Sequence, residues 1–336
     1  MNRILATILM VGVLILTGCG GRTLYIYNWT YYIPDQVIRE FEKTYLCKVV
    51  YDAYSSNEEM FAKLKAGGLG YDIVFPSGDF TKIMINEGML EKLDKRKLPN
   101  IKYLDKQILS RITFDRGNQY SVPYMAGTAG IAVNRKYVKD YDHSSTIFDR
   151  SDLKGKMTLL DDMREVIGMA LKRLGYSVNS TDSSQLEQAK AVALRWKDNI
   201  LKFDAESFAK GFAAGEYWVV QGYAENIFLE LDEEQKKSVD FFVPKEGSTM
   251  YIDSMVILKH APHPELAYAF INFIHEPKIY AQIADYLQLP AINTGAKAYT
   301  KRKPHYELED LVKCQLKEDL GDDIVKFNRV WEAVRM

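Results

Sequence analysis

Residues 24–53 have the sequence LYIYNWTYYIPDQVIREFEKTYLCKVVYDA, which predicts a strand, a helix and a second strand. The strand pattern runs to Tyr27, and Pro34 suits the first turn of a helix because no partner is needed there for the N–H that proline lacks. Apolar side chains recur at helical spacing within residues 34–45, so one face of this helix should pack on a sheet. Residues 48–53 are expected as the next strand. Elements in this order indicate a parallel α/β sheet.

The same order of elements continues along the chain. Ser56 and Glu59 form a capping-box pattern that starts a second helix, and residues 71–75 are expected as a third strand. Residues 120–133 are expected to be extended and to carry the chain into a second lobe. That lobe repeats the scheme, with strands expected at residues 156–160 and 239–243 and helices at 163–175 and 183–199.

The N-terminus predicts export. Arg3 precedes an apolar run, residues 4–16, that is too short for a permanent membrane span, which needs about 20 residues. The run ends in Leu16-Thr17-Gly18-Cys19, which matches a bacterial lipoprotein signal in which residues 1–18 are removed and Cys19 is acylated. An ordinary secretory signal with an incidental cysteine is the alternative interpretation.

Composition excludes several classes of function. The 336-residue chain carries 44 basic and 45 acidic residues, which gives no electrostatic case for a nucleic-acid partner. Cys47 and Cys314 have no metal-type spacing, and we expect both to be buried free thiols. No phosphate-binding loop, nucleophile elbow or dinucleotide fingerprint is present, so we expect no cofactor, no metal and no catalytic residue.

The candidate site residues lie just beyond predicted strands, where open α/β sheets bind ligands. Four such segments stand out, namely residues 29–32, 77–79, 161–165 and 251–253.

In the segment STMYIDSMVIL, strand alternation puts Tyr251 and Asp253 on one face that is otherwise apolar. An isolated buried carboxylate is very costly, so Asp253 must find a partner. That partner is either a lysine or arginine from elsewhere in the chain, or the cation of a ligand with the Tyr251 ring beside it. The residues alone leave both interpretations open.

Asp162 and Glu165 begin the predicted helix in LLDDMREVIGMAL. Their spacing is itself a helix-capping pattern, and this is the interpretation that spacing alone favours. One carboxylate can cap while the other faces a ligand, and paired acids suit an ammonium group, which has three donors and no acceptor.

Aromatic and small polar residues occupy the other two segments. Trp29 and Tyr32 sit in a strand-to-helix turn, where rings are well placed to line a slot for methylenes and cations. Thr30, Ser77 and Asp79 are polar groups at the two turns, although Asp79 is equally suited to cap the following helix.

Taken together, these segments resemble the periplasmic spermidine/putrescine-binding receptors of polyamine ABC transporters. The resemblance covers nearly the whole chain after the signal, and it rests on five blocks in the right order: LYIYNWTYYIP, YDIVFPSGDF, SVPYMAGTAGIAVN, LLDDMREVIGMALKRLGYS and VDFFVPKEGSTMYIDSM. It implies a two-lobed periplasmic binding protein fold of type II, an α/β fold whose lobes each hold a mixed, mainly parallel sheet flanked by helices. The implied lobes are residues 19–127 with 254–297, and residues 128–253 with 298–336.

The resemblance also implies roles for single residues. Asp253 would be the main anchor for one amino group, while Asp162 and Glu165 would take another amine. Trp29 and Tyr32 would be aromatic walls, Thr30 and Ser77 nearby polar contacts, and Tyr251 stands where the family often has tryptophan.

The chain departs from the family pattern at several positions. An aromatic is common after Ser77, where this chain has Gly78-Asp79-Phe80. A family tryptophan corresponds to Val220, beside Gln221, unless Trp218 compensates, and a family tyrosine corresponds to Leu289. We include Asp79 and Gln221 among the candidate ligand contacts, and these departures predict an altered amine preference.

The implied function is capture of putrescine or spermidine outside the cytoplasm by a monomer whose lobes close over the ligand and dock on a membrane permease. Alternatives are another small cation or a ligand sensor on the same fold, and a hydrolase that uses Asp161, Asp162 or Glu165 as an acid and base pair.

Overall fold

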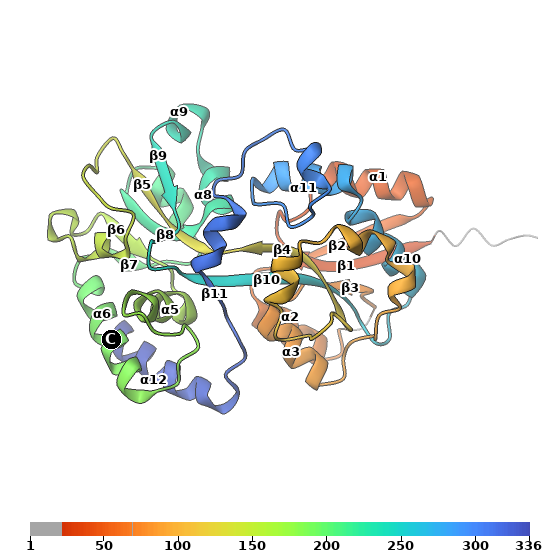
Figure 1. Ribbon diagram of the computed structural model, residues 1–336, viewed down its shortest axis with the longest axis horizontal. Coiled ribbons are helices and arrows are strands. Elements are labelled where there is room, and N and C mark those ends of the chain that lie inside the picture. The colour runs from red at the N-terminus through yellow and green to blue at the C-terminus, as the bar shows by residue number, and fades with distance from the viewer. Residues whose placement is uncertain (1–21, 69) are drawn as a thin grey trace, which may run out of the picture.

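The computed structural model describes residues 22–68 and 70–336. The predicted lipidation site Cys19 and the predicted signal therefore lie outside the described residues. Figure 1 shows two lobes side by side, with the long strand β10 (Thr249–Ile257) passing between them. In the part of the chain that is described, no helix is both long and apolar enough to cross a membrane.

The first lobe holds a mixed six-stranded sheet in the order β11-β10-β3-β1-β2, with β4 paired to β10. Strand β1 (Thr23–Trp29) runs parallel to β2 (Lys48–Tyr54) and β3 (Ile73–Val74). Strand β10 is antiparallel to β3 and β4. The remaining elements of this part are β4 (Ser121–Gly127), β11 (Gln315–Leu316), α1 (Asp35–Tyr45), α2 (Asn57–Lys65), α3 (Gly78–Asn86), α4 (Lys106–Ser110), α10 (Pro264–Ile274) and α11 (Pro277–Leu287).

The second lobe holds a five-stranded sheet in the order β7-β6-β8-β5-β9. Strand β6 (Met157–Leu159) is parallel to its neighbours, and β5 (Ala129–Asn134) is antiparallel to β8 and β9. The other elements are β7 (Lys202–Phe203), β8 (Val219–Tyr223), β9 (Val239–Phe242), α5 (Met163–Arg173), α6 (Ser183–Lys197), α7 (Phe208–Ala213), α8 (Ala224–Glu230), α9 (Glu233–Lys236) and α12 (Ile324–Arg335). The C-terminal helix α12 packs against α5 and α6 (Figure 1).

Short 3₁₀ helices join these elements in both lobes. They are Lys95–Lys97, Pro99–Tyr103, Ser145–Asp149, Ser151–Leu153, Ala296–Ala298, Leu308–Lys313 and Gly321–Asp323.

Most predicted elements are confirmed, and two need correction. Helix α1 begins at Asp35, and Pro34 is its N-cap in extended conformation instead of a residue of the first turn. The third strand is only Ile73–Val74 because the Phe75 carbonyl is taken by side chains, accepting hydrogen bonds from Trp29 Nε1 at 2.9 Å and the Tyr54 hydroxyl at 2.7 Å.

The chain passes between the sheets at Thr128, which separates β4 from β5. Its hydroxyl donates to the Thr249 carbonyl at 2.5 Å, and the Ser248 hydroxyl donates to the Ala129 carbonyl at 2.8 Å. These bonds join the first passage to the second, which leads from β9 into β10. The exact division of the chain into lobes stays a prediction, and β10 pairs with the first sheet from Thr249 onward.

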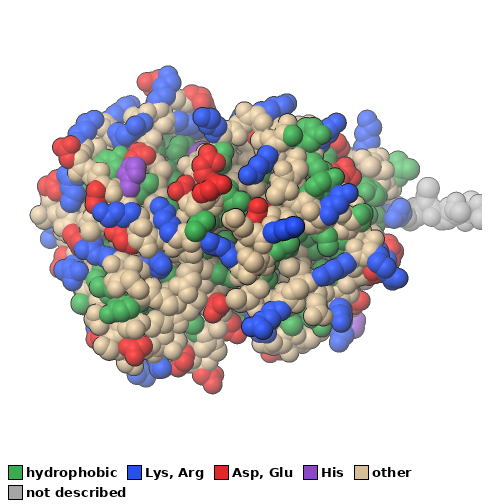
Figure 2. Space-filling model, in the orientation of Figure 1, with side chains coloured by type: hydrophobic (Ala, Val, Ile, Leu, Met, Phe, Trp, Pro, Cys, Tyr) green, Lys and Arg blue, Asp and Glu red, His purple; other side chains and the backbone are tan. Residues whose placement is uncertain are grey.

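Charge is spread over the molecule. Figure 2 shows acidic and basic side chains interspersed on the face in view, in keeping with a formal net charge of −1 for the whole chain. Of the two cysteines predicted to be free thiols, both are free, with Cys314 buried and Cys47 partly exposed.

Asp115 fixes the start of β4. Its buried carboxylate accepts from the amides of Gln119, Tyr120 and Ser121 at 3.0, 2.9 and 2.9 Å. Asp115→Ala leaves these donors unsatisfied, so we expect it to lower the free energy of unfolding by about 2–4 kcal/mol in urea denaturation. Asp182→Ala, which removes the exposed cap of α6, is the control and should cost about 1 kcal/mol. Equal losses in the two variants would contradict the role of Asp115.

Candidate ligand-binding site

The candidate residues meet where the two lobes adjoin. Tyr32, Ser77, Asp79, Tyr251 and Asp253 come from the first lobe. Asp162, Glu165 and Gln221 come from the second. Hydrogen bonds join the groups directly, because the Tyr251 hydroxyl donates to Glu225 at 3.0 Å and the Thr249 hydroxyl donates to Glu165.

Asp253 is a buried carboxylate with no cationic partner among the described residues. Its side chain lies in β10 with the residue 6% exposed, and the Tyr32 hydroxyl donates to Oδ2 at 2.7 Å. No lysine or arginine of the described residues comes within 4.0 Å of it. Burial raises its pKa to about 7, while the Tyr32 hydrogen bond and the charge of Lys317 act in the opposite direction. The sequence left open whether Asp253 pairs with a lysine or arginine of the chain or with a ligand cation. The first prediction is wrong for the described residues.

Glu225 is a second carboxylate without a protein cation among the described residues. The residue is partly exposed, and it was not among the candidates predicted from the sequence. It lies in the first turn of α8 and accepts from the Tyr251 hydroxyl through Oε1. Oε2 is buried and has no hydrogen-bond partner among the residues described. Burial raises the pKa of Glu225 to about 7. The signal was available, because Glu225 follows the carboxyl end of β8, the criterion that selected the other candidates.

Glu165 is buried, but a cation of the protein already occupies it. Lys317 Nζ lies 2.6 Å from Glu165 Oε1, with side-chain exposures of 15% and 1%. The Tyr223 hydroxyl donates to the same oxygen at 3.2 Å, and Thr249 donates to the other. Burial alone would lower the pKa of Lys317, but the charges of Glu165, Asp162 and Asp79 outweigh it and the pKa is raised. The amine role that the resemblance implies for Glu165 therefore has an internal competitor.

Asp162 and Asp79 serve helix starts. Asp162 caps α5, since its Oδ1 accepts from the amides of Arg164 at 2.8 Å and Glu165 at 3.0 Å, which confirms the capping interpretation. Asp79 lies in the first turn of α3, where it accepts from the Ser77 hydroxyl and from the Phe80 amide. Ser77 is itself buried and accepts from Asn57 Nδ2 at 2.8 Å.

Gln221 is fully buried and its amide group is used on both sides. It accepts from the Leu160 amide at 3.3 Å and donates to the Glu165 carbonyl at 3.3 Å. These bonds connect the end of β6 with the start of α5, so Gln221 positions Glu165.

The aromatic candidates divide into two groups. Tyr32, Tyr251 and Tyr223 bind the buried carboxylates, and the rings of Tyr223 and Tyr251 are 5.9 Å apart. Trp29 instead donates to the Phe75 carbonyl, and its ring centroid lies 4.7 Å from that of Tyr54. Thr30 is exposed. Trp218 stacks on Tyr137 at 4.9 Å, so the compensation considered for it is not observed among the described residues.

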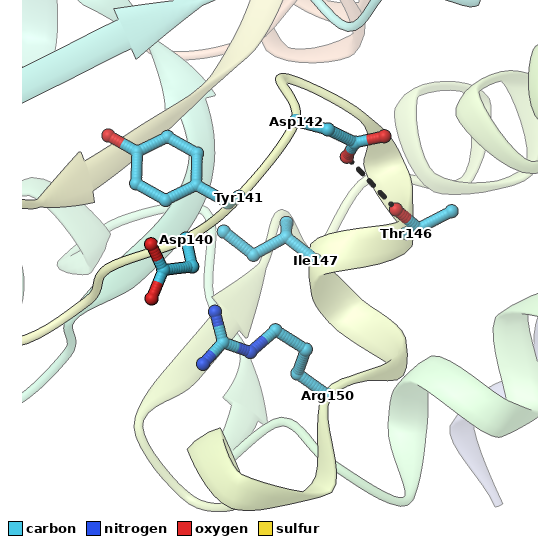
Figure 3. Close-up of a pocket in the computed structure, with 6 residues that line it drawn as sticks. All are labelled: Asp140, Tyr141, Asp142, Thr146, Ile147 and Arg150. Carbon is cyan, nitrogen blue, oxygen red and sulfur yellow. Dashed lines mark hydrogen bonds between the residues drawn. The ribbon is translucent and has the colours of Figure 1, made fainter.

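A separate depression lies on the second lobe. It is lined by Asp140, Tyr141, Asp142, Thr146, Ile147 and Arg150. Figure 3 shows Asp140 and Arg150 facing the same space, with Thr146 bonded to Asp142. None of the candidate residues lines it. Two of its charged side chains are already paired, Asp142 with Lys245 and Arg150 with Asp152.

Residues 36–307 match the model of the family described as bacterial extracellular solute-binding protein. The chain belongs to this family. Members are solute-binding proteins, which agrees with a site built from buried carboxylates and tyrosine hydroxyls at a lobe junction.

Named relatives of this solute-binding protein bind polyamines. The putrescine/cadaverine-binding protein of Pseudomonas aeruginosa is 35% identical over 294 residues, covering 83% of this chain and 81% of the relative. The spermidine/putrescine-binding periplasmic protein of Escherichia coli is 37% identical over 279 residues, covering 82% and 79%. The solved TpPotD lipoprotein of Treponema pallidum is 46% identical with a TM-score of 0.91, covering 93% of this chain and 99% of that one. These similarities confirm the predicted two-lobed periplasmic binding protein fold.

The buried carboxylate of Asp253 predicts how the stability of the ligand-free solute-binding protein depends on pH. Its folded-state pKa is about 7 against an ordinary value of 3.8, so its contribution to stability is present below about pH 4 and is lost as pH rises through about 7. Asp253→Asn removes the ionising group. The unfolding free energy of this variant relative to wild type should rise between about pH 4 and pH 7, by up to about 4 kcal/mol, and level off at higher pH.

Thermal unfolding of both proteins across this pH range measures the difference. Glu225, Asp79, Lys317 and Tyr32 are the neighbouring titratable groups and are unchanged in the variant. Asp142→Asn, at an exposed carboxylate, is the control. Its thermal unfolding should depend on pH in the same way as that of the wild type over this range. A difference that shrinks toward pH 8 would contradict the assignment.

Proposed function

We propose that this protein captures a polyamine outside the cytoplasm, holds it between its two lobes and delivers it to the permease of an ABC transporter. The relatives named for putrescine, cadaverine and spermidine support the ligand class. The family of extracellular solute-binding proteins supports the location. The protein acts by binding, and no bond of the ligand is broken.

The observation that carries this proposal is the pair of carboxyl groups, Asp253 and Glu225, that each accept only a tyrosine hydroxyl. Asp253 has only a tyrosine hydroxyl as partner, and Glu225 has an unpartnered oxygen, among the described residues. Buried carboxylates without a cation are costly. A protonated amine supplies both the charge and the hydrogen-bond donors, and charge-assisted hydrogen bonds of this kind are strong when water is excluded.

Tyrosine rings suit the rest of such a ligand. Tyr32, Tyr223 and Tyr251 each direct a hydroxyl to a carboxylate, and aromatic rings at such a site favour both methylenes and cations. The hydrolase alternative has no support, because Asp161 pairs with Arg335 at 3.0 Å, Asp162 caps α5 and Glu165 pairs with Lys317.

Closure of the lobes over the ligand follows from where these groups originate. Asp253 belongs to the first sheet and Glu225 to the second lobe, so a ligand that binds both stabilises the closed arrangement over the open one.

Isothermal titration calorimetry with putrescine, cadaverine, spermidine and spermine tests the proposal on the exported form of the protein. We expect binding of at least one of them, and Asp253→Asn should weaken it by about 2 kcal/mol or more, roughly 30-fold, because a buried charge pair is broken. Asp142→Asn is the matched control and should bind as wild type. Absence of binding by all four amines, or equal affinity in Asp253→Asn, would refute the proposal.

We further propose that a lipid on Cys19 anchors the protein to a membrane near its permease. The support is the apolar run before Leu16-Thr17-Gly18-Cys19. Several acyl chains hold a protein stably where one holds it weakly.

Labelling of cells with a tagged fatty acid, followed by membrane fractionation, tests the anchor. We expect the full chain to carry label and to remain with the membrane fraction. Cys19→Ser should abolish both, while Cys47→Ser should change neither. Label that persists in Cys19→Ser would assign the lipid elsewhere.

A further inference from the structure

We propose that Lys317 is a specificity-determining residue whose ammonium fills the Glu165 end of the site, so that the protein prefers a diamine to the longer triamine spermidine. This inference rests on the polyamine-binding function proposed above and concerns which polyamine the site accepts. It comes from the ion pair of Lys317 with Glu165.

The position of Lys317 is fixed by the backbone around it. The residue follows β11, whose Gln315 and Leu316 pair in parallel with Thr249 and Met250 of β10. The Lys317 amide donates to the Met250 carbonyl at 3.1 Å. Because β10 also carries Tyr251 and Asp253, the lysine is attached to the same strand that presents the candidate anchor.

The Glu165 end has little capacity left for a ligand amine. Lys317 and the Tyr223 hydroxyl donate to Oε1, and the Thr249 hydroxyl donates to Oε2. A ligand ammonium brings three donors and needs several acceptors. It would have to displace Lys317 from a carboxylate that is 1% exposed, or lie beside a like charge, which is unfavourable at short range.

The charges that remain match two ammonium groups. Asp162 is used by the amides of α5, and Asp79 by the Ser77 hydroxyl and the Phe80 amide. Arg164 turns away from Glu165, since its guanidinium donates to the Glu318 carbonyl at 3.0 Å and to Asn179 at 2.7 Å. No basic side chain of the described residues pairs with any of these four carboxyl groups, but backbone amides hold Asp162 and Asp79. Asp253 and Glu225 each accept only a tyrosine hydroxyl, so they are the two groups left for a ligand cation. A diamine satisfies both, whereas the third ammonium of a triamine would approach Lys317.

The wild-type protein provides the first test. Calorimetry with unbranched diamines of increasing length, from 1,3-diaminopropane to 1,8-diaminooctane, and with spermidine should give an affinity that reaches a maximum at a short diamine and then falls. We expect spermidine to bind at least about tenfold more weakly than the best diamine, equivalent to about 1.4 kcal/mol. Spermidine that binds as tightly as the best diamine would overturn the inference while leaving the polyamine-binding function intact. No binding of any amine would refute that function instead.

Lys317→Met removes the charge and keeps most of the side-chain length. The ratio of the spermidine Kd to the putrescine Kd should fall by about tenfold or more, because the Glu165 end becomes available to the third amine. Lys245→Met, at an exposed ion pair with Asp142, is the matched control and should keep the wild-type ratio.

A double variant separates the charge effect from a general loosening of the site. Lys317→Met combined with Glu165→Gln removes both members of the ion pair, so neither remains as an unpaired buried charge, which favours folding over the single variant. In this double variant the ratio of the spermidine Kd to the putrescine Kd should not fall as it does in Lys317→Met. An unchanged ratio in Lys317→Met, or the same fall in the double variant, would overturn the inference. If Lys317→Met does not fold, the diamine series on wild type decides.

Discussion

The cost of burying a carboxylate without a cation is the constraint on which this site depends. Asp253 and Glu225 are held in the junction between the lobes by hydroxyl groups of Tyr32 and Tyr251, which satisfy part of their hydrogen-bonding capacity but none of their charge. The fold tolerates them because burial raises their pKa values to about 7, so that protonation relieves the penalty when no cation is present. A bound cation therefore stabilises the site. It acts on both lobes, because each lobe contributes one of the carboxyl groups.

Acidic residues of the same type play three different parts within this small region. Asp162 satisfies the amides of a helix start, Glu165 holds the ammonium of Lys317, and Asp253 has no protein cation among the described residues. Their burial and neighbours distinguish them, not their identity or their distance from a strand end. The family resemblance assigned amines to all three, because similarity in sequence carries over a position but not the partner that a particular chain provides there.

Much of the fold follows from local sequence. Apolar periodicity and turn residues were sufficient for α1 and β2, since these depend on interactions between near neighbours. The end of β3 was not predictable, because the Phe75 carbonyl is taken by the side chains of Trp29 and Tyr54. The rule that ligands lie beyond strand ends found Glu165, and it applied equally to Glu225. Asp253 does not obey that rule, because it lies inside β10, and it was found from the apolar strand face around it. Lys317 had no such signal, because β11 is two residues long and meets β10 only through tertiary folding.

The passages between the lobes determine what kind of movement the molecule can make. Two of them are tied together by the hydroxyl groups of Thr128 and Ser248, and the segment through β11 is joined to the same place by its pairing with Thr249 and Met250 before the chain enters α12. Three interlobe connections that are held together at one place form a hinge, which favours bending of one lobe toward the other. A distance measured across the junction therefore reports opening and closing of the lobes.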